Sequence, residues 1–475
     1  MDTRLLLKVL GRRRELAARD GWSPSQVRTY QARRLAALRD HSQLRSRFYR
    51  EFHRGLTRAP LAELPILTKA VLMDRFDDRI TRGDLRLADA RAHLAAEAGA
   101  QRLMGRYYVA ATAGTTGEPG IFVWDVEEWA EVLASYSRAY GWAGASVRLT
   151  GRTRMAVVSS TVPSHQSALV GASVDSRFVP TLRIDSGDPL EDVVRRLNHF
   201  RPDVLVGYAS MLGLLAGEQR AGRLHVQPGA VLSASEVLTA EARRDVEHAW
   251  NRRPFNVYAA TETAGIAAEC GQHAGLHLFE DLVITEVVDD EGRPFTPGEY
   301  GSRLLVTVLG SRTLPLIRYE LSDSVRMLPA PPCPCGRPFL RIGGVQGRAE
   351  EALRLPAARG GDILVQPNVV HRAMELLPLT GWQVVLDDSG ITVYVAGLAE
   401  LADTGQVARR LADALALAGA VAPPVRAVRV PAVSRTALGK APLIRSVRGG
   451  GEHPGRGRDK AADTCPVPDF LADRL

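Results

Sequence analysis

The sequence of 475 residues predicts an α/β protein with a large N-terminal domain, built on mainly parallel sheets, and a small mobile α+β C-terminal domain. Three observations predict this fold class. Short apolar runs such as MAVVSS from 155 and DVLVGY from 203 alternate with helical stretches, as in parallel sheets. Closely spaced strands between 282 and 327 indicate a small antiparallel sheet or barrel. A second set of strands and helices follows the Pro- and Cys-rich segment 331–348.

The elements can be predicted in order along the chain. Residues 1 to about 85 read as helical, and Ser23, Pro24 and Gln26 supply an N-cap, a first-turn proline and a capping-box glutamine. Strands are expected near 155, 203 and 230, with the helices EDVVRRLNHF and AEARRDVEHAW between and after them. The C-terminal unit should contain a helix near 367–377, the strands WQVVLDD and ITVYVAG, the helix QVARRLADALALA and the strand VRAVRV. The expected divisions are 1–85 (helical segment of the large domain), 86–347 (α/β core), 348–447 (mobile domain) and 448–475 (flexible tail).

The composition excludes several classes of protein. With 45% hydrophobic and 24% charged residues, the chain is neither fibrous nor disordered, and no apolar run suits a signal peptide or a spanning helix. A net charge of +8 is modest for this length and indicates neither nucleic acid nor a membrane as partner. Four cysteines are too few for a disulfide scaffold, so we expect a cytoplasmic protein. Only four of the 61 basic residues are lysines, at 8, 69, 440 and 460.

Six short segments carry candidate chemistry. The Gly- and Thr-rich segment 112–119 is a plausible phosphate cradle, although it is not a Walker A loop. YAATET at 258–263 and SASE at 233–236 each end a predicted strand, where a carboxylate could hold Mg²⁺ and an aromatic ring could lie on a purine. The others are RYELSD at 318–323, GRAEE at 347–351 and RTALGK at 435–440. Each alone is equally typical of a surface loop or a helix cap.

The order of these motifs is more specific than any one of them. Together with PILTK at 65–69, RPDVLVGYAS at 201–210 and CPCGR at 333–337, they make the chain resemble the phenylacetate-CoA ligase branch of the adenylate-forming superfamily. The resemblance implies ATP-dependent activation of a small acid, most simply an aromatic one, as an acyl-adenylate that is then transferred to coenzyme A. Two alternatives stay open. The acceptor could be an amine, a carrier-protein thiol or another small nucleophile, or the chain could be a non-catalytic nucleotide-binding pseudoenzyme.

The resemblance also implies roles for individual residues. Lys440 would bridge the substrate carboxylate and the α-phosphate, Glu262 would bind Mg²⁺, and Glu350 would be the hinge. The nucleotide site would contain Thr112, Gly114, Thr115, Thr116, Gly117, Ser235, Glu236, Tyr258, Ala259, Thr261, Asp323, Arg337 and Arg348. The acid pocket would contain His165, Tyr208, Ser235, Ala260 and Gly265. Ala113 and Glu118 depart from the family pattern and motivate the pseudoenzyme alternative, and a homodimer stays open.

A metal site is the last expectation. Cys270, His277, Cys333 and Cys335 make a complete Cys₃His set for tetrahedral Zn²⁺, and the family has the same residues in the same order. The alternative is a group of small buried thiols without a metal. His273 is the rival histidine, and Cys465 in the tail is expected to be free. Because 56 positions separate His277 from Cys333, the fold must bring the two halves together.

Overall fold

A computed structural model gives the arrangement of most of the chain. The described residues are 3–96, 101–112, 119–145, 152–289, 292–295, 298, 300–301, 303–329, 332–348, 351–365, 367–374, 377, 379, 381–398, 403–434 and 443–447.

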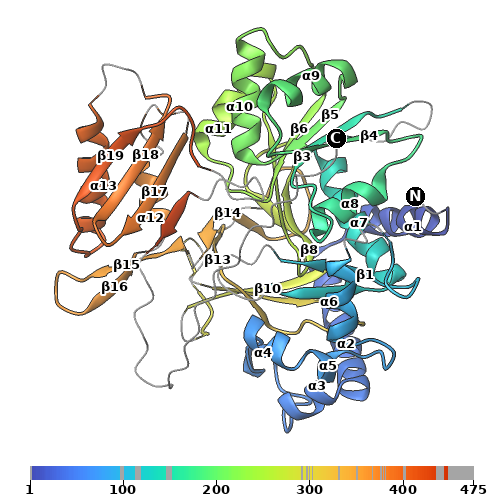
Figure 1. Cartoon of the computed structure of the whole chain (residues 1–475). Coiled ribbons are helices and arrows are strands. Elements are labelled where there is room, and N and C mark those ends of the chain that lie inside the picture. Colours follow the sequence, from blue (N-terminus) through green and yellow to red (C-terminus); the bar gives the residue numbers. More distant parts are fainter. Residues whose placement is uncertain are drawn as a thin grey trace, which may run out of the picture.

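A nine-stranded sheet, in the order β13-β14-β9-β8-β7-β6-β5-β3-β4, lies at the centre of the large domain (Figure 1). Its parallel half consists of β3 (Met155–Ser159), β4 (Thr181–Asp185), β5 (Val204–Gly207), β6 (Ala230–Ala234) and β7 (Phe255–Ala260). The connecting helices are α8 (Gln166–Val174), α9 (Leu190–Phe200), α10 (Ala209–Arg220) and α11 (Ala240–Trp250). The predicted strands near 155, 203 and 230 and the two predicted helices are confirmed.

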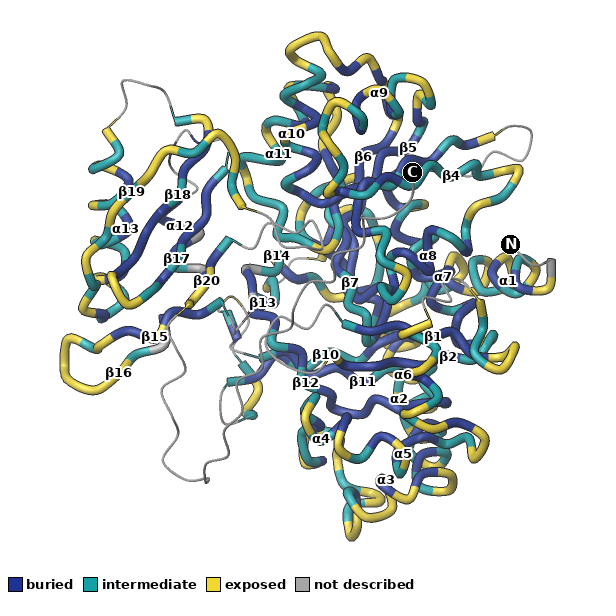
Figure 2. Tube along the Cα trace, in the orientation of Figure 1, coloured by how far each residue is buried: buried dark blue, intermediate teal, exposed yellow. Residues whose placement is uncertain are grey.

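Both faces of the parallel half are buried, which explains why these strands are almost continuously apolar. Ala156, Leu205 and Val231 pack against α9, α10 and α11. Alternate residues such as Met155, Val204 and Leu232 pack in a second cluster with α8 and with α7 (Val126–Trp142). Figure 1 shows α9–α11 together on one side of these strands and α7 and α8 on the other, and Figure 2 shows the strands buried between them.

The other half of the sheet is antiparallel, which the sequence did not predict. It consists of β8 (Ala264–Glu269), β9 (Leu276–Leu278), β14 (Arg341–Arg348) and β13 (Asp323–Met327). We expected the whole segment 316–327 to lie in the small antiparallel sheet, and this was wrong. Only β12 (Tyr319–Leu321) joins β10 (Val283–Val288) and β11 (Arg303–Val308) there, because the chain leaves that sheet at Ser322 and continues as β13 beside β14.

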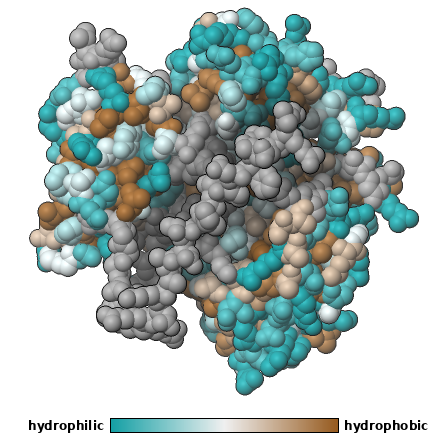
Figure 3. Space-filling view, in the orientation of Figure 1, coloured by the Kyte–Doolittle hydropathy of each residue, from teal (hydrophilic) through white to brown (hydrophobic). Residues whose placement is uncertain are grey.

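The N-terminal segment is helical, as predicted. It contains α1 (Thr3–Arg19), α2 (Pro24–Arg45), α3 (Arg47–Phe52), η1 (Leu61–Glu63), α4 (Lys69–Asp74), α5 (Phe76–Arg79) and α6 (Leu87–Ala95). The capping box of Ser23 and Gln26 forms as expected, with Pro24 in the first turn. A hairpin of β1 (Tyr108–Ala111) and β2 (Ile121–Trp124) follows. The face of α2–α5 seen in Figure 3 is largely hydrophilic, which suits a solvent-facing helical segment.

The C-terminal residues form a second hydrophobic cluster of their own around Trp382. A sheet in the order β19-β18-β17-β20 contains β17 (Gly381–Asp387), β18 (Gly390–Ala396), β19 (Val425–Arg429) and β20 (Ile444–Ser446). α12 (Pro367–Met374) and α13 (Thr404–Leu417) were predicted, whereas β20 and the hairpin of β15 (Leu353–Pro356) and β16 (Asp362–Val365) were not. Figure 1 shows this unit standing beside the large domain, beyond β13 and β14. No helix in the described part of the chain is long and apolar enough to cross a membrane.

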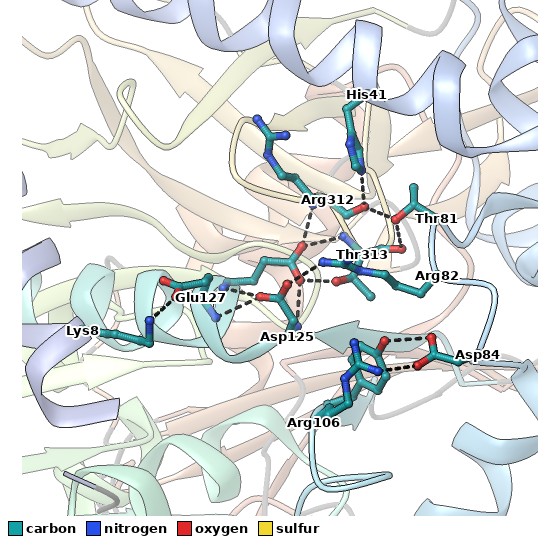
Figure 4. A network of polar contacts seen from close by, with 12 residues as sticks. Lys8, His41, Thr81, Arg82, Asp84, Arg106, Asp125, Glu127, Arg312 and Thr313 are labelled. Carbon is teal, nitrogen blue, oxygen red and sulfur yellow. Dashed lines mark hydrogen bonds and ion pairs between the residues drawn. The ribbon is translucent and has the colours of Figure 1, made fainter. Parts of the chain in front are cut away.

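A buried carboxylate anchors the start of α7. The Glu128 side chain accepts hydrogen bonds from the backbone N–H groups of Asp125 (2.8 Å), Arg312 (2.6 Å) and Thr313 (2.8 Å). The Thr313 hydroxyl donates a fourth at 2.5 Å. Figure 4 shows how this network joins the helical segment, the start of α7 and the loop after β11. Glu128 therefore fixes where α7 begins.

Replacing Glu128 with alanine is expected to lower the free energy of unfolding by about 3 kcal/mol or more, because several buried donors lose their acceptor. Urea denaturation measures the change. Glu127→Ala is the matched control, since Glu127 is half exposed and pairs only with Lys8 among the described contacts. Its expected effect is within about 0.5 kcal/mol. Equal losses in the two variants would contradict the anchoring role of Glu128.

A buried histidine predicts a pH dependence of stability. His53 is 2% exposed, and neither ring nitrogen has a hydrogen-bond partner within the described residues. Burial, helped by the positive charge of Arg39, lowers the pKa of His53 to about 4. The unfolded chain binds a proton near pH 6.5, so the folded state loses up to ~3 kcal/mol of stability as the pH falls from about 6.5 to about 4.

His53→Phe should remove this loss, because phenylalanine keeps the packing against Tyr49 and Phe52 without a proton-binding group. The unfolding free energies of the wild type and the variant are compared at several pH values in this window. The exposed His225, replaced in the same way, serves as the control. If the unfolding free energies of the wild type and of His53→Phe depend on pH in the same way, His53 does not cause the loss of stability at low pH.

Candidate active site

Glu262 lies at the tip of a tight hairpin. β7 and β8 pair antiparallel, with Ala260 opposite Ala264, so Thr261, Glu262 and Thr263 form the turn between them. The turn is closed by a hydrogen bond from Thr263 N to Ala260 O at 3.2 Å, and Ala264 adopts a φ of +65°. The Glu262 carboxylate thus projects from the carboxyl end of β7, the position at which α/β sheets hold ligands.

Two hydrogen bonds join the YAATE and RYELSD motifs, which lie more than 50 residues apart. The Tyr258 hydroxyl donates to Asp323 Oδ2 at 2.5 Å, and the Tyr319 hydroxyl lies 3.5 Å from Glu262 Oε1. Asp323 also pairs across the antiparallel ladder with Arg348. These two contacts hold the end of β7 and the turn after it against the segment 319–323.

The candidate phosphate loop joins this region at its base. Thr112 N donates to Gly120 O at 2.9 Å, and Gly120 N donates to Thr112 Oγ1 at 2.8 Å, so the two ends of the loop are tied together. Lys69 lies at this base, because a Cβ on Gly120 would be 3.5 Å from Lys69 Cε. One of the four lysines of the chain thus stands beside the loop that has Glu118 where the family often has lysine.

The direction of the chain changes between β3 and β5, which is where ligands bind in open α/β sheets. The chain leaves β3 toward α8 on one face of the sheet and leaves β5 toward α10 on the other, so the two connections diverge at the carboxyl ends of neighbouring strands. Ser160 N donates to the Tyr208 hydroxyl at 3.0 Å across this point. Ala111 N, next to the phosphate loop, donates to Ser164 O at 2.8 Å. The predicted acid-pocket segments therefore lie beside the predicted phosphate segment.

The other predicted pocket residues lie around the same edge. His165 occupies the N-cap position of α8, and Glu236 accepts a hydrogen bond from Ser210 N at 2.9 Å. Ser235 is exposed with a φ of +67°. Ala259 and Ala260 end β7. Gly265 packs closely, since an added Cβ would lie 2.8 Å from Phe279 and 3.0 Å from Ser135 Oγ.

Several predicted residues lie outside the described part of the chain. They are Gly114, Thr115, Thr116, Gly117, Glu350 and Lys440, together with Ala113 and Glu118. Cys465 and the expected tail 448–475 also lie outside it. Arg348 is described only by its backbone in β14.

The four predicted metal ligands meet in one cluster, in which Cys270, His277 and Cys333 are buried and Cys335 is half-buried. Their ligand atoms all lie within 4.8 Å of one another. Cys270 Sγ is 3.7 Å from Cys333 Sγ, and Cys335 Sγ is 3.3 Å from His277 Nε2. Sulfur ligands of a tetrahedral zinc, each about 2.3 Å from the ion, stand about 3.8 Å apart. The donor set and its spacing therefore fit Zn²⁺.

Strand pairing closes the long gap in sequence between these ligands. His277 in β9 pairs with Ala268 in β8 and with Arg341 in β14, which brings the ends of three strands together. Cys270 follows β8, and Cys333 and Cys335 precede β14. Gly336 N donates to Cys333 O at 3.1 Å in a tight turn, and its φ of +79° favours glycine.

The residues around the cluster fix the orientation of the His277 ring. His277 Nδ1 lies 3.4 Å from Phe339 O, which leaves Nε2 facing Cys335. Burial, helped by Arg337 and Arg341, lowers the pKa of His277 to about 4, so the ring is neutral as a metal ligand must be. Arg337 lies over the Trp142 ring at 4.4 Å, and that ring contacts His277 of the cluster. The rival His273 instead pairs with Glu269, Nδ1 to Oε2 at 3.1 Å.

Sequence reasoning missed three side chains of the site. Gln166 is buried and bridges the Tyr136 hydroxyl and the Thr261 carbonyl, each at 3.0 Å. Tyr319 lies within the RYELSD motif but had no role assigned, and neither did Lys69. Lysine is scarce in this chain, and this could have drawn attention to Lys69. A glutamine at the start of a short helix, such as Gln166, gives no such signal.

The fold is that of the adenylate-forming acyl-CoA ligases. The solved structure of 2-hydroxyisobutyryl-CoA ligase in the postadenylation state matches with a TM-score of 0.70 at 16% identity, over 91% of both chains. Its structure in the thioesterification state matches with a TM-score of 0.57. The large sheet, the small antiparallel sheet and the C-terminal unit thus form a known architecture, and the predicted fold class is confirmed.

In sequence, the chain is similar to curated phenylacetate-coenzyme A ligases. It is 30% identical to phenylacetate-coenzyme A ligase of Thermus thermophilus over 296 residues, which cover 59% of this chain and 63% of the relative. It is 29% identical to the Pseudomonas putida enzyme over 255 residues, which cover 51% and 55%. The chain spans less than two thirds of the length of these relatives. No protein-family profile matches it.

Proposed function

We propose that the protein activates a carboxylic acid with ATP and transfers the acyl group to coenzyme A. The observation that carries the proposal is the pair of hydrogen bonds that joins Tyr258 to Asp323 and Tyr319 to Glu262. Glu262 would hold Mg²⁺, which neutralises phosphate charge when it is bound. Asp323 would accept hydrogen bonds from the ribose hydroxyls, and Lys69 would supply a positive charge at the base of the phosphate loop.

Adenylation joins two anions, so the chain must offset their repulsion. Lys440 of the C-terminal unit would lie between the acid carboxylate and the α-phosphate and stabilise the charge that develops there. Coenzyme A would then displace AMP, after the C-terminal unit has turned about Glu350. An amine or a carrier-protein thiol is the second candidate acceptor. The proposed setting is the cytoplasm, where cysteine ligands stay reduced.

Tyr258 is expected to position Asp323. Tyr258→Phe removes the donor that holds this carboxylate, so the KM for ATP should rise by about tenfold, the equivalent of one lost hydrogen bond to a charged group. Steady-state kinetics with varied ATP measure the change. Tyr136→Phe is the matched control, because its hydroxyl bonds Gln166 and not Asp323. A KM for ATP that is unchanged in Tyr258→Phe, or changed equally in both variants, would contradict this role.

We also propose that Cys270, His277, Cys333 and Cys335 hold a structural Zn²⁺. The set supplies four protein ligands, three of them buried, so a tetrahedral ion would have no open position for a substrate. When bound, the ion would supply cross-linking energy and no catalytic step. The four side chains would pin the segment after β8, which follows Glu262, to the segment that leads into β14 and the hinge.

AMP release with and without coenzyme A tests the choice of acceptor. If coenzyme A is the acceptor, its addition to protein, MgATP and a suitable acid should convert a single turnover into many, with one AMP formed per thioester. Hydroxylamine in place of coenzyme A is the control, because it traps acyl-adenylates without an acceptor site. A reaction stimulated by hydroxylamine but not by coenzyme A would favour the amine or carrier-protein alternative.

A further inference from the structure

The turn that carries Glu262 is irregular. The pairing of β7 with β8 shifts register between Tyr258 and Ala259, and Ala264, which follows the turn, has a φ of +65°. A residue with a side chain keeps this left-handed conformation only where its surroundings enforce it. Contacts from outside the hairpin must therefore help to hold the turn.

Helix α7 holds one end of this turn directly. Gly265 N donates to Ser135 Oγ at 3.2 Å, and the same hydroxyl donates to Val132 O within the helix at 2.7 Å. The hydroxyl is therefore oriented as an acceptor for Gly265. A Cβ on Gly265 would lie 3.0 Å from Ser135 Oγ and 2.8 Å from Phe279, so glycine lets the strand approach the helix this closely.

Gln166 holds the other end of the turn. Its Nε2 donates to the carbonyl oxygen of Thr261, which precedes Glu262, at 3.0 Å. The Tyr136 hydroxyl donates to Gln166 Oε1, also at 3.0 Å, and burial raises the pKa of Tyr136, so this hydroxyl stays protonated. Because Tyr136 occupies the amide oxygen, the amide nitrogen faces Thr261. Gln166 is only 3% exposed, so water competes little for these contacts.

The segment that contains Gln166 also contacts the start of the phosphate loop. Ser164 O accepts a hydrogen bond from Ala111 N at 2.8 Å, and Thr112 follows as the first residue of that loop. Residues 164–166 therefore contact the phosphate loop on one side and the turn of Glu262 on the other. Mg²⁺ requires nearly octahedral oxygen ligands at about 2.1 Å, so a carboxylate that shares the ion with phosphates must be placed closely.

We infer that Gln166 is a positioning residue, which fixes the Glu262 carboxylate relative to the phosphate loop and thereby sets the Mg²⁺ site. This inference deepens the proposed function and rests on it, since Glu262 has its metal-binding role there. Gln166 acts through the Thr261 carbonyl and not by binding the ion. Without this contact Glu262 is free to take several positions, and ordering it then costs part of the energy of metal binding.

Binding of an ATP analogue tests the inference without a reaction. The Kd of α,β-methylene-ATP, in which the bond broken by adenylation is blocked, is measured by calorimetry with and without Mg²⁺. Mg²⁺ should tighten binding to the wild type, and Gln166→Met should reduce this tightening about tenfold, the equivalent of one lost buried hydrogen bond. The Kd without Mg²⁺ should not change. Gln166→Glu, which keeps the size and the acceptor for Tyr136 but replaces the amide donor, is the second variant if the first does not fold.

Two further variants make the experiment specific. Ser173→Ala is the matched control, because Ser173 Oγ accepts from Trp129 Nε1 at 3.1 Å, a buried bond between the same two helices that involves no residue of the turn. It should keep the full effect of Mg²⁺. Glu262→Ala should lose the effect, and adding Gln166→Met to Glu262→Ala should change nothing more, since Gln166 acts through Glu262.

The outcomes separate this inference from the proposed function. The inference would be overturned by a wild type whose binding Mg²⁺ does not tighten, by full tightening in Gln166→Met, by an equal loss in Ser173→Ala, or by a further loss in the double variant. ATP–pyrophosphate exchange by the wild type would leave the proposed function standing in each case. Tightening that depends on Gln166, in a wild type that supports exchange with no acid, would support the inference and contradict the proposed function.

Discussion

Lys440→Ala is expected to lower acyl-adenylate formation by about 10²-fold or more, because a fixed charge aimed at a developing anion contributes several kcal/mol to transition-state stabilisation. The role of Lys440 is inferred from the sequence. It follows a glycine near the end of the C-terminal unit, and lysine is rare elsewhere in the chain. Thioester formation from a chemically prepared acyl-adenylate should be largely spared, because the C-terminal unit is expected to turn away for that step. Single-turnover assays of the two half-reactions measure the difference.

Two further variants make the Lys440 experiment specific. Lys440→Arg keeps the charge but changes its shape and reach, so it should recover only part of the lost rate. Lys460→Ala removes the other lysine near the C-terminus and should change neither half-reaction. An equal fall of both half-reactions in Lys440→Ala would show that the residue does not act in adenylation alone. A normal rate of adenylation would contradict the assignment altogether.

Cys333→Ser is expected to lower the zinc content from about one ion per chain toward zero, and to lower the free energy of unfolding by about 4 kcal/mol or more. Serine keeps the size of the side chain but removes the thiolate ligand. The effect on stability should be large because Cys333 connects segments that are 63 residues apart at the cluster, and they lose their common ion. Metal analysis and denaturation of the purified protein measure both quantities.

His273→Asn is the matched control for the metal site. His273 is near Cys270 in sequence but pairs with Glu269, and its φ of +47° is a conformation that asparagine tolerates. This variant should keep its zinc. Loss of zinc in His273→Asn and not in His277→Asn would reassign the histidine ligand. Metal-free wild-type protein with unchanged stability in Cys333→Ser would contradict the zinc proposal.

The parallel half of the large sheet could be predicted because its signals are local. β3, β5 and β6 are short apolar runs between amphipathic helices, and each is buried on both faces. The capping box at Ser23 is equally local. β8, β9 and β13 could not be assigned to this sheet, since short antiparallel strands have the same appearance in any sheet. The change of sheet at Ser322 depends on pairing with β14, which lies later in the chain.

The features of the candidate site also differ in whether the sequence predicts them. The motifs that contain Glu262 and Asp323 could be predicted because their order along the chain is distinctive. The contact between Tyr258 and Asp323 spans 65 residues, and nothing local to either motif predicts it. The role of Gln166 could not be predicted from the sequence. Its partners, the Tyr136 hydroxyl and the Thr261 carbonyl, are 30 and 95 residues away from it. The cysteine cluster could be proposed from residue type. The sequence does not show that β9 pairs with β14, and this pairing brings His277 close to Cys333 and Cys335.

ATP–pyrophosphate exchange across a panel of acids is the most direct test of the central claim, that this chain forms acyl-adenylates. Labelled pyrophosphate should enter ATP only when Mg²⁺ and a suitable acid are both present, and Glu262→Ala should lower the rate by about 10²-fold. Coenzyme A is left out, so the result does not depend on the acceptor. Binding of ATP without exchange for any acid in the panel would contradict the claim and support a nucleotide-binding protein without ligase activity.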